Sequence, residues 1–303
     1  MLVAGVDENG LGPGLGPLVV TAIVLDVPDS GEVALRLDGH ALPPSVADSK
    51  VVFKRTVRSY AAGEAVALAL ARALDSASAA SHVSAFLAAV TRGGCGLAAD
   101  GGPAELHHAE IPMPLWGGDP APIAAALADA GIRVVDLACR VLFPAEFNSV
   151  RTGPGGKLAL NYRVFEEALA LLGARPPLAL LGKIGGTRFY RPWLDASPRL
   201  SDVETVGEEP AESRYRTRFG GAPVELRFVR DGDSTYLPIA AASLVGKYVR
   251  EASMLCLNRA LGFLDPIPHA SGYWSDPKTR LAIERFEQRF SATVPRAAFL
   301  RDG

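Results

Sequence analysis

Short runs of hydrophobic residues alternate along the chain with longer segments in which apolar residues recur at helical spacing. Residues 1–8 and 18–25 are short and apolar and are bounded by acidic residues, Gly or Pro, as is typical of β-strands. Residues 52–75 carry Val, Ala and Leu at helical spacing without Pro, which predicts a helix. The same criteria predict strands at 132–142, 178–181, 213–219 and 223–230, and helices at 82–90, 120–131, 157–172, 235–261 and 276–290.

Strands that alternate with helices after an early hairpin favour an α/β fold with a mixed sheet and helices on its faces. We expect a five-stranded sheet in a single domain that spans residues 1–303. Residues 93–120 differ from the rest because they are rich in Gly and Pro, and we interpret them as an irregular insertion. This insertion contains the adjacent His107 and His108, which we interpret as solvated loop residues rather than metal ligands.

The composition narrows the function classes. Of the 303 residues 49% are hydrophobic, so a substantial core can form, yet no stretch reaches the roughly 18 apolar residues of a membrane span. The N-terminus lacks the basic region of a signal peptide. Cys95, Cys139 and Cys256 are odd in number and far apart, which indicates a reducing compartment without a zinc cluster. We therefore expect a cytoplasmic monomer that does not bind membranes.

The net charge of −2 does not indicate a nucleic-acid partner, so phosphate contacts would require a local basic patch. Candidate chemistry begins at Asp7 and Glu8, where the first predicted strand ends. Paired carboxylates at such a point can hold Mg²⁺, although an isolated pair is more often a solvated strand terminus. A glycine loop (residues 10–17) follows, and its main chain could approach a phosphate or sugar closely and donate N–H groups. A dinucleotide-binding motif does not fit, because Leu15 replaces the third glycine and Pro13 stands where a helix should open.

The run from Gly5 to Val20 resembles the first motif of the type 2 ribonucleases H (ribonucleases HII and HIII). The resemblance implies that Asp7 and Glu8 bind a catalytic metal ion. It also implies that the loop residues contact the substrate, namely Asn9, Gly10, Leu11 and Gly12. The central residue of the family's loop is commonly Arg, so Leu11 removes a charged donor and puts in question the usual preference for a single ribonucleotide embedded in DNA.

Three further segments resemble the same family. Asp48-Ser49-Lys50 resembles a turn that opens a helix, in which Asp48 or Ser49 can cap the helix and Lys50 can meet a phosphate. The run from Asp231 to Glu251 resembles a motif with an acid before a helix of small residues; Asp233 fits the spacing, and Ser243 and Lys247 share a helical face. Gly272-Tyr273-Trp274 resembles the motif whose tyrosine stacks on a sugar. Each segment also has an ordinary structural interpretation. Asp48-Ser49-Lys50 alone would indicate a capped helix with a solvated first turn, the run from Asp231 to Glu251 fits an amphipathic helix with an acidic N-terminal turn, and Tyr273 fits a core aromatic residue in a loop.

The pattern departs from the family at the third of its usual four acids. Gly182 stands where that Asp would follow the strand 178–181, and Lys183 lies beside it. Either Asp7, Glu8 and Asp233 suffice for catalysis, or hydrolysis is lost and binding is kept. Lys183 and Arg188 form a basic group that suits phosphates in both cases.

The resemblance as a whole implies a ribonuclease H-like fold and a metal-dependent endonuclease. Its substrate would be RNA in RNA/DNA hybrids or ribonucleotides embedded in DNA, and its cofactor Mg²⁺ or Mn²⁺. Hydrolysis would use two ions, one activating a water and the other stabilising the leaving 3′ oxygen. Two alternatives stay open: a nucleic-acid-binding protein of this fold without catalysis, and a phosphotransfer or nucleotide-binding enzyme for small molecules.

Overall fold

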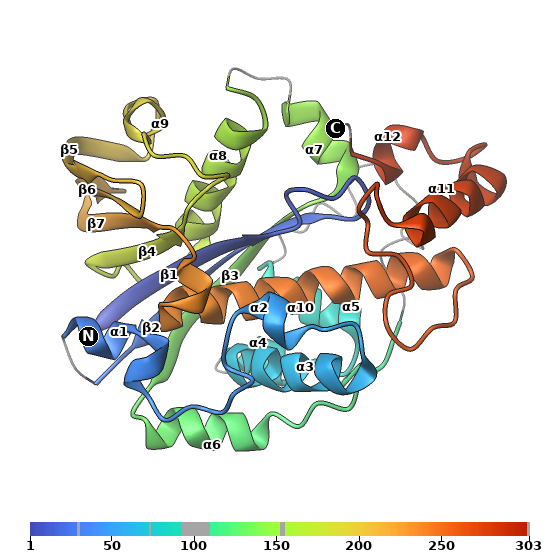
Figure 1. The fold of residues 1–303 in the computed structure, drawn as a ribbon, viewed down its shortest axis with the longest axis horizontal. Helices are drawn as coiled ribbons and strands as arrows, with labels where there is room; N and C mark the ends of the chain where they lie inside the picture. Colours follow the sequence, from blue (N-terminus) through green and yellow to red (C-terminus); the bar gives the residue numbers. More distant parts are fainter. Residues whose placement is uncertain (29–30, 73, 93–109, 152–154, 302–303) are drawn as a thin grey trace.

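A computed structural model describes residues 1–28, 31–72, 74–92, 110–151 and 155–301. Its centre is a seven-stranded mixed sheet with the strand order β3-β2-β1-β4-β7-β6-β5 (Figure 1). The strands are β1 (Leu2–Asn9), β2 (Leu18–Asp26), β3 (Arg133–Leu142), β4 (Leu178–Gly182), β5 (Leu200–Glu208), β6 (Glu212–Phe219) and β7 (Ala222–Val229). The expectation of a five-stranded sheet is therefore wrong.

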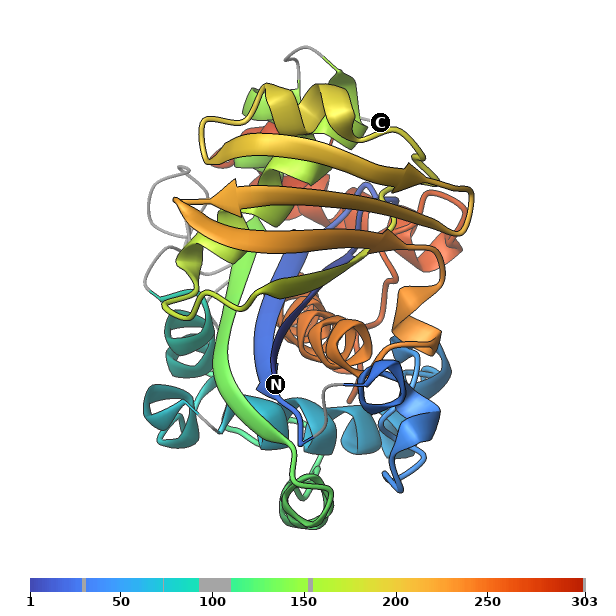
Figure 2. The ribbon, with the colours of Figure 1, turned by 90° about the vertical axis from the view of Figure 1, so that its left-hand side faces the viewer.

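The antiparallel strands β5, β6 and β7 form one side of the sheet (Figure 2). The sequence pattern does not predict β5. This strand lies at the edge of the sheet and is mostly exposed, so its sequence is polar and shows no clear alternation of apolar residues. In contrast, β2 is buried along almost its whole length and reads as a continuous hydrophobic run, as buried central strands do.

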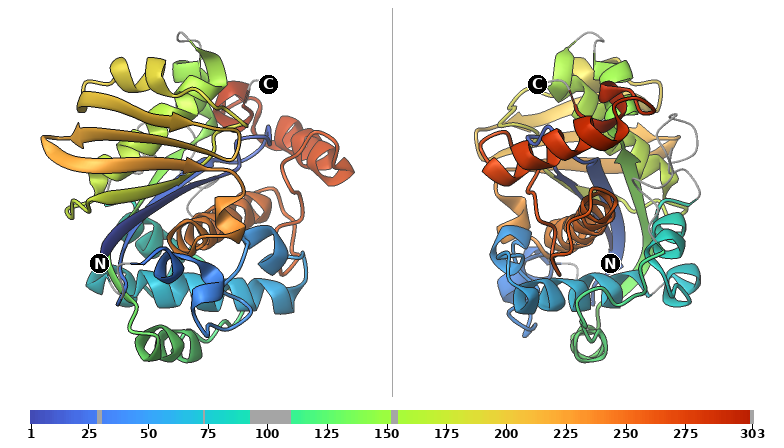
Figure 3. Two further views of the ribbon diagram at one scale, coloured as in Figure 1. Left: turned by 60° about the vertical axis from the view of Figure 1, so that its left-hand side comes forward. Right: turned by 90° about the vertical axis from the view of Figure 1, so that its right-hand side faces the viewer.

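Helices cover both faces of the sheet (Figures 1 and 3). The long helix α10 (Leu237–Ala260) crosses one face with α3 (Val57–Ala71) packed against it, and α8 (Gly156–Leu171) covers the other face. Ala240, Ala241 and Ala242 are fully buried, which lets α10 approach the sheet closely. The remaining helices are α1 (Glu32–Leu35), α2 (Ser49–Val52), α4 (Asp75–Ser78), α5 (Val83–Val90), α6 (Ala121–Asp129), α7 (Pro144–Arg151), α9 (Arg191–Asp195), α11 (Pro277–Phe290) and α12 (Arg296–Phe299), with 3₁₀ turns at Leu37–Gly39 and Gly232–Ser234.

The helix predicted at 52–75 is shorter in the structure, because α3 covers Val57–Ala71 and the short helices α2 and α4 reach into the predicted range only with Val52 and Asp75. Thr56 has extended backbone angles and caps α3 through a reciprocal pair of hydrogen bonds with Ser59. This capping box starts α3 at Val57, because an N-cap residue lies outside helical geometry.

Three neighbouring strands run parallel and end at the same level of the sheet. Val6 of β1 pairs with Leu181 of β4, and Gly182 of β4 pairs with Val229 of β7. Asp7, Gly182 and the turn that follows β7 therefore meet at one edge, although they are far apart in the sequence.

The described part of the proposed insertion, residues 110–120, is anchored by a buried carboxylate. Glu64 of α3 accepts hydrogen bonds from the amides of Leu115 (2.5 Å), Trp116 (2.8 Å) and Gly118 (2.9 Å). The hydroxyl of Tyr248 also donates to it at 3.0 Å. The segment thus packs on α3 through a polar contact that is satisfied on all sides.

Residues 93–109 lie outside the described residues, and so does the interpretation of His107 and His108. The single-domain organisation, the cytoplasmic location and the monomeric state stay predictions. Among the described residues, no helix has both the length and the hydrophobicity of a membrane span.

Candidate active site

A pocket of about 500 Å³ opens where the parallel strands end. Thirteen of the fourteen side chains and loop residues expected at a site line it: Asp7, Glu8, Asn9, Gly10, Leu11, Gly12, Ser49, Lys50, Lys183, Asp233, Ser243, Lys247 and Tyr273. Arg188 does not line it, because its Nε atom donates instead to the carbonyl of Glu208 at the end of β5.

Asp7 and Asp233 approach each other on the α10 side of the sheet. β1 carries Asp7 to the pocket, and the 3₁₀ turn after β7 carries Asp233. Burial and the repulsion from Asp233 raise the pKa of Asp7 to about 7, while Ser243 and Lys50 oppose this shift. The Lys50 ammonium lies 3.3 Å from Asp233 Oδ2. The two acids thus form an unfavourable pair of like charges that a cation would relieve.

Lys50 reaches this pair from the turn that opens α2. The side chain of Asp48 accepts a hydrogen bond from the Lys50 amide at 2.7 Å and caps the helix. Ser49 and Ser243, both buried, share a hydrogen bond of 3.0 Å that ties this turn to α10. The resulting arrangement holds the Lys50 backbone firmly, while its side chain remains 80% exposed.

Glu8 follows Asp7 on β1 and lines the same pocket. Burial and repulsion from Asp7 hold the pKa of the Glu8 carboxyl well above its usual range. In the described part of the chain, no three His, Cys, Asp or Glu side chains are arranged as a complete metal centre. The structure therefore brings Asp7 and Asp233 together with Glu8 beside them, but the three carboxylates do not form a complete set of metal ligands.

The donor chemistry of this pair fits a hard divalent cation. Asp7, Asp233 and Glu8 offer only carboxylate oxygens, which Mg²⁺ and Mn²⁺ prefer. A bound cation would offset the repulsion between the negative charges of Asp7 and Asp233. Asp195 and Asp202 do not line the pocket and instead pair with exposed arginines on α9 and β6.

Gly182, the last residue of β4, adjoins Asp7 directly. A Cβ atom built on Gly182 would lie 2.4 Å from Asp7 Oδ1, so any side chain there would project into the acid pair. Lys183, the next residue, turns away and donates to the carbonyls of Glu209 (2.7 Å) and Pro210 (3.2 Å). These two backbone carbonyls engage the ammonium group of Lys183.

An aromatic residue closes the pocket on the side of the glycine loop. Tyr273 is 51% exposed, and its ring lies 3.2 Å from where a Cβ of Gly12 would stand. Trp274 is 48% exposed and packs in the same way on Gly14. The pocket thus combines acids, a close-packed backbone loop and an exposed aromatic ring.

Part of the chain is similar in sequence to known ribonucleases. Residues 196–301 match the family model for ribonuclease HII. Ribonuclease HII of Aeropyrum pernix is 35% identical over 88 residues, which cover 29% of this chain and 37% of that protein. Ribonuclease HII of Methanothermobacter thermautotrophicus is 33% identical over 97 residues, which cover 30% of this chain and 44% of that protein. Each of these matches covers about a third of this chain, and the chain spans less than half of the length of both relatives.

Solved structures of ribonucleases HIII share the fold. Bst-RNase HIII in complex with Mn²⁺ is 16% identical, with a TM-score of 0.50 over 99% of this chain and 66% of that chain. A mutant of Bst-RNase HIII is 17% identical, with a TM-score of 0.50 over 99% of this chain and 65% of that chain. The mixed α/β sheet is therefore of the ribonuclease H-like type, with seven strands rather than five.

The pocket also contains Tyr60, Arg250 and Glu251, which the sequence pattern did not single out as site residues. Glu251 pairs with Lys247 at 2.8 Å and with Arg250 at 3.2 Å. Tyr60 donates its hydroxyl to Glu251 at 2.7 Å. The signal that could have revealed this cluster is the occurrence of three charged residues within five positions of a largely apolar helix.

Proposed function

We propose that this chain is a metal-dependent endonuclease that hydrolyses RNA in RNA/DNA hybrids or at ribonucleotides embedded in DNA. The observation that carries the proposal is the approach of Asp7 and Asp233, from opposite ends of the chain, in a pocket beside the glycine loop. The similarity of residues 196–301 to ribonuclease HII supports the same activity.

Asp7 and Asp233, with Glu8 beside them, would hold Mg²⁺ or Mn²⁺. The bound metal supplies Lewis-acid chemistry at the scissile phosphate. Lys50 neutralises Asp233 at 3.3 Å and, with 80% of its side chain exposed, can turn toward a phosphate once a cation takes over that role. Ser243 holds the Asp7 carboxylate by a hydrogen bond and so fixes the direction of its oxygens.

The substrate strand would lie along the glycine loop. Backbone N–H groups at Leu11 and Gly12 suit a phosphate or a ribose hydroxyl, because no side chain intervenes at the glycine. The exposed ring of Tyr273 suits stacking on a sugar or base. Lys183 and Lys247 line the same pocket but are engaged with other groups, so they would contribute to binding through their charge.

We further propose that the site lacks a third carboxylate at residue 182. Gly182 adjoins Asp7, where an acid would complete the oxygen ligands. This observation favours a second candidate function, a protein of the same fold that binds nucleic acid without cutting it. The two functions predict the same binding surface and differ only in hydrolysis.

The decisive experiment is a cleavage assay with three substrates: an RNA/DNA hybrid, a DNA duplex with one embedded ribonucleotide, and an all-DNA duplex. Wild type is compared with Asp7→Asn and with Asp195→Asn, a matched control on surface helix α9. We expect Mg²⁺- or Mn²⁺-dependent cleavage of ribonucleotide-containing substrates that Asp7→Asn reduces by about 100-fold or more and Asp195→Asn leaves unchanged.

Binding of the hybrid without cleavage above the Asp7→Asn background would support the non-catalytic binder instead. Neither binding nor cleavage would exclude both functions.

A further inference from the structure

The inner side of the glycine loop is held by two arginines from distant parts of the chain. Arg301 donates from Nη2 to the carbonyls of Gly10 (2.5 Å) and Pro13, and its backbone amide donates to the carbonyl of Gly14 at 2.8 Å. Arg250 of α10 donates from Nη2 to the carbonyl of Leu15 at 3.4 Å. Four loop carbonyls are thus turned inward and satisfied.

The loop amides differ from the carbonyls in their hydrogen-bond partners. Gly14 and Leu15 donate to the carbonyl of Gly272 at 3.0 and 3.2 Å. The amides of Leu11 and Gly12 have no hydrogen-bond partner in the parts of the chain that the structure describes, and both residues line the pocket. Carbonyls on the inside and amides toward the pocket give the loop a polarity that attracts an anion or an electron-rich oxygen.

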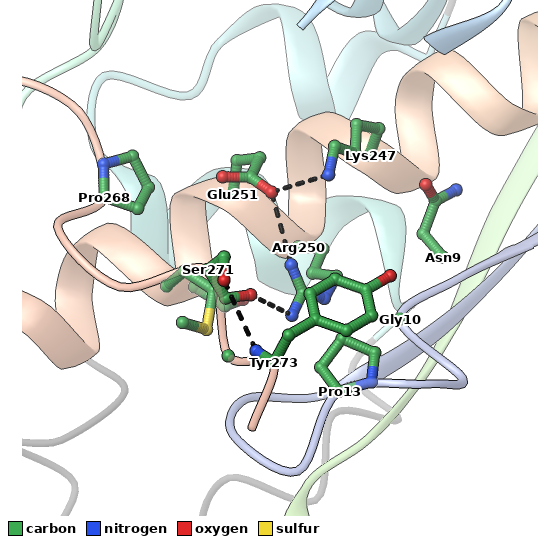
Figure 4. Close-up of polar contacts among 12 residues, drawn as sticks. Asn9, Gly10, Pro13, Lys247, Arg250, Glu251, Pro268, Ser271 and Tyr273 are labelled. Atoms are coloured by element: carbon green, nitrogen blue, oxygen red, sulfur yellow. Dashed lines mark hydrogen bonds and ion pairs between the residues drawn. The ribbon is translucent and has the colours of Figure 1, made fainter. Parts of the chain in front are cut away.

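Close packing explains the glycine at the start of the loop. Gly10 has a φ of +91°, and a Cβ there would lie 2.5 Å from Arg250 Nε. Figure 4 shows the Arg250 side chain between Glu251, Ser271 and the loop. The loop therefore sits directly on the guanidinium group.

Arg301 is a buried cation whose charge is poorly compensated. Its side chain is 2% exposed and lies over the ring of Phe147 at 4.8 Å. Among the described residues no carboxylate pairs with it, and its Nε and Nη1 atoms have no hydrogen-bond partner. Burial, with repulsion from Arg250, lowers the pKa of Arg301 to about 9, so it is still protonated at neutral pH. An uncompensated buried charge destabilises a fold, and an apolar side chain would serve packing better.

We propose that Arg301 is a positioning residue that fixes the glycine loop with its Leu11 and Gly12 amides toward the substrate strand and adds positive charge behind them. The identity of that strand rests on the function proposed above. Arg301 itself does not line the pocket, so it acts through the loop and touches no substrate.

The contacts around Arg301 allow the role to be tested without removing the C-terminal segment. Asn148 of α7 donates to the carbonyls of Ala297 (3.0 Å) and Leu300 (2.8 Å), and Leu15 forms a β-bridge with Leu300. These contacts do not involve the guanidinium, so Arg301→Met keeps them together with most of the packing on Phe147.

The experiment compares wild type, Arg301→Met, Arg301→Lys and the control Arg296→Met. Arg296 is in the same segment and loses the same charge, but its side chain is 66% exposed. Three quantities are measured: hydrogen exchange of the Gly14 and Leu15 amides, the Kd for an RNA/DNA hybrid, and KM and kcat for its cleavage.

We expect Arg301→Met to speed exchange at both amides and to raise Kd and KM by about tenfold, with kcat changed less than about threefold. Arg301→Lys should give an intermediate effect and Arg296→Met none. Should Arg301→Met not fold, the Lys variant, which keeps the charge but loses the planar pair of donors, decides the question.

The proposal would be overturned if the Arg301 variants kept the Kd, KM and exchange rates of wild type and differed only in a lower melting temperature. That result would show a purely structural role. If wild type itself neither binds nor cleaves the hybrid, the proposed function fails. The exchange data still decide whether Arg301 holds the loop: faster exchange at Gly14 and Leu15 in Arg301→Met supports this role, and unchanged exchange contradicts it.

Discussion

Gly182 and Asp7 lie so close at the ends of β4 and β1 that a Cβ on Gly182 would stand 2.4 Å from Asp7 Oδ1. A carboxylate introduced at residue 182 would therefore point at the acid pair once Asp7 rotates slightly. We predict that Gly182→Asp raises kcat/KM for hybrid cleavage by about tenfold at limiting Mn²⁺, since it adds an oxygen ligand.

The neutral variant Gly182→Asn has nearly the same shape and is the control for crowding at Asp7. Cleavage rates are measured across a Mn²⁺ titration for all three proteins. Equal rates for the Asp and Asn variants would show that residue 182 does not take part in metal binding.

Divalent metal should stabilise the protein through Asp7. We predict that saturating Mn²⁺ raises the melting temperature of wild type by about 5 °C, because a ligand that binds only the folded state stabilises it. Asp7→Asn should show little increase, whereas Asp195→Asn should respond like wild type. Differential scanning fluorimetry with and without EDTA measures the shift, and an equal rise in the Asp7→Asn protein would contradict the proposed metal ligand.

The exposed ring of Tyr273 should matter for binding and not for folding. We predict that Tyr273→Ala raises KM for the hybrid by about tenfold, in keeping with the free energy of stacking, while Tyr273→Phe retains most of the affinity. Steady-state kinetics give KM, and thermal melting shows whether stability is unchanged. A fall in melting temperature without a change in KM would assign the ring to the fold instead.

Glu251 should make stability depend on pH in the acid range. Burial alone would raise the pKa of Glu251 above its ordinary value of 4.5. Lys247, Arg250 and Tyr60 outweigh this effect and lower the pKa to about 2. A lowered folded-state pKa gives stability that is complete above about pH 5 and is lost as the pH falls toward 2. We predict that Glu251→Gln lowers the free energy of unfolding by about 3 kcal/mol at pH 7.

The measurement is urea unfolding of both proteins at pH 7, 5 and 3.5. The difference between wild type and Glu251→Gln should be constant from pH 7 to 5 and smaller at pH 3.5. A difference that does not change with pH would mean that the ionised form of Glu251 contributes nothing.

Much of the fold follows from local patterns. β2 is buried along its length, and its Val and Ile residues predict a strand. The alanines of α10 predict a helix that packs closely against a sheet. The placement of Asp7 beside Asp233 could be anticipated only through the family resemblance, since no local pattern brings β1 and the turn after β7 together.

The rest depends on tertiary contacts that a sequence does not display. β5 is polar because it lies at an edge, so periodicity does not reveal it. Lys183 and Arg188 look like phosphate ligands, yet nearby backbone carbonyls take up their donors. Arg301 reads as a surface residue near a helix, because nothing local predicts its burial against Phe147.

The β-bridge between Leu15 and Leu300 couples the order of synthesis to the assembly of the pocket. A ribosome makes the glycine loop early and the segment that supports it hundreds of residues later. Until then the loop lacks the guanidinium of Arg301 and its strand partner Leu300, and such long-range closure is slow. A translation product that stops before α12 would carry every acid of the pocket but lack both of these contacts to the loop.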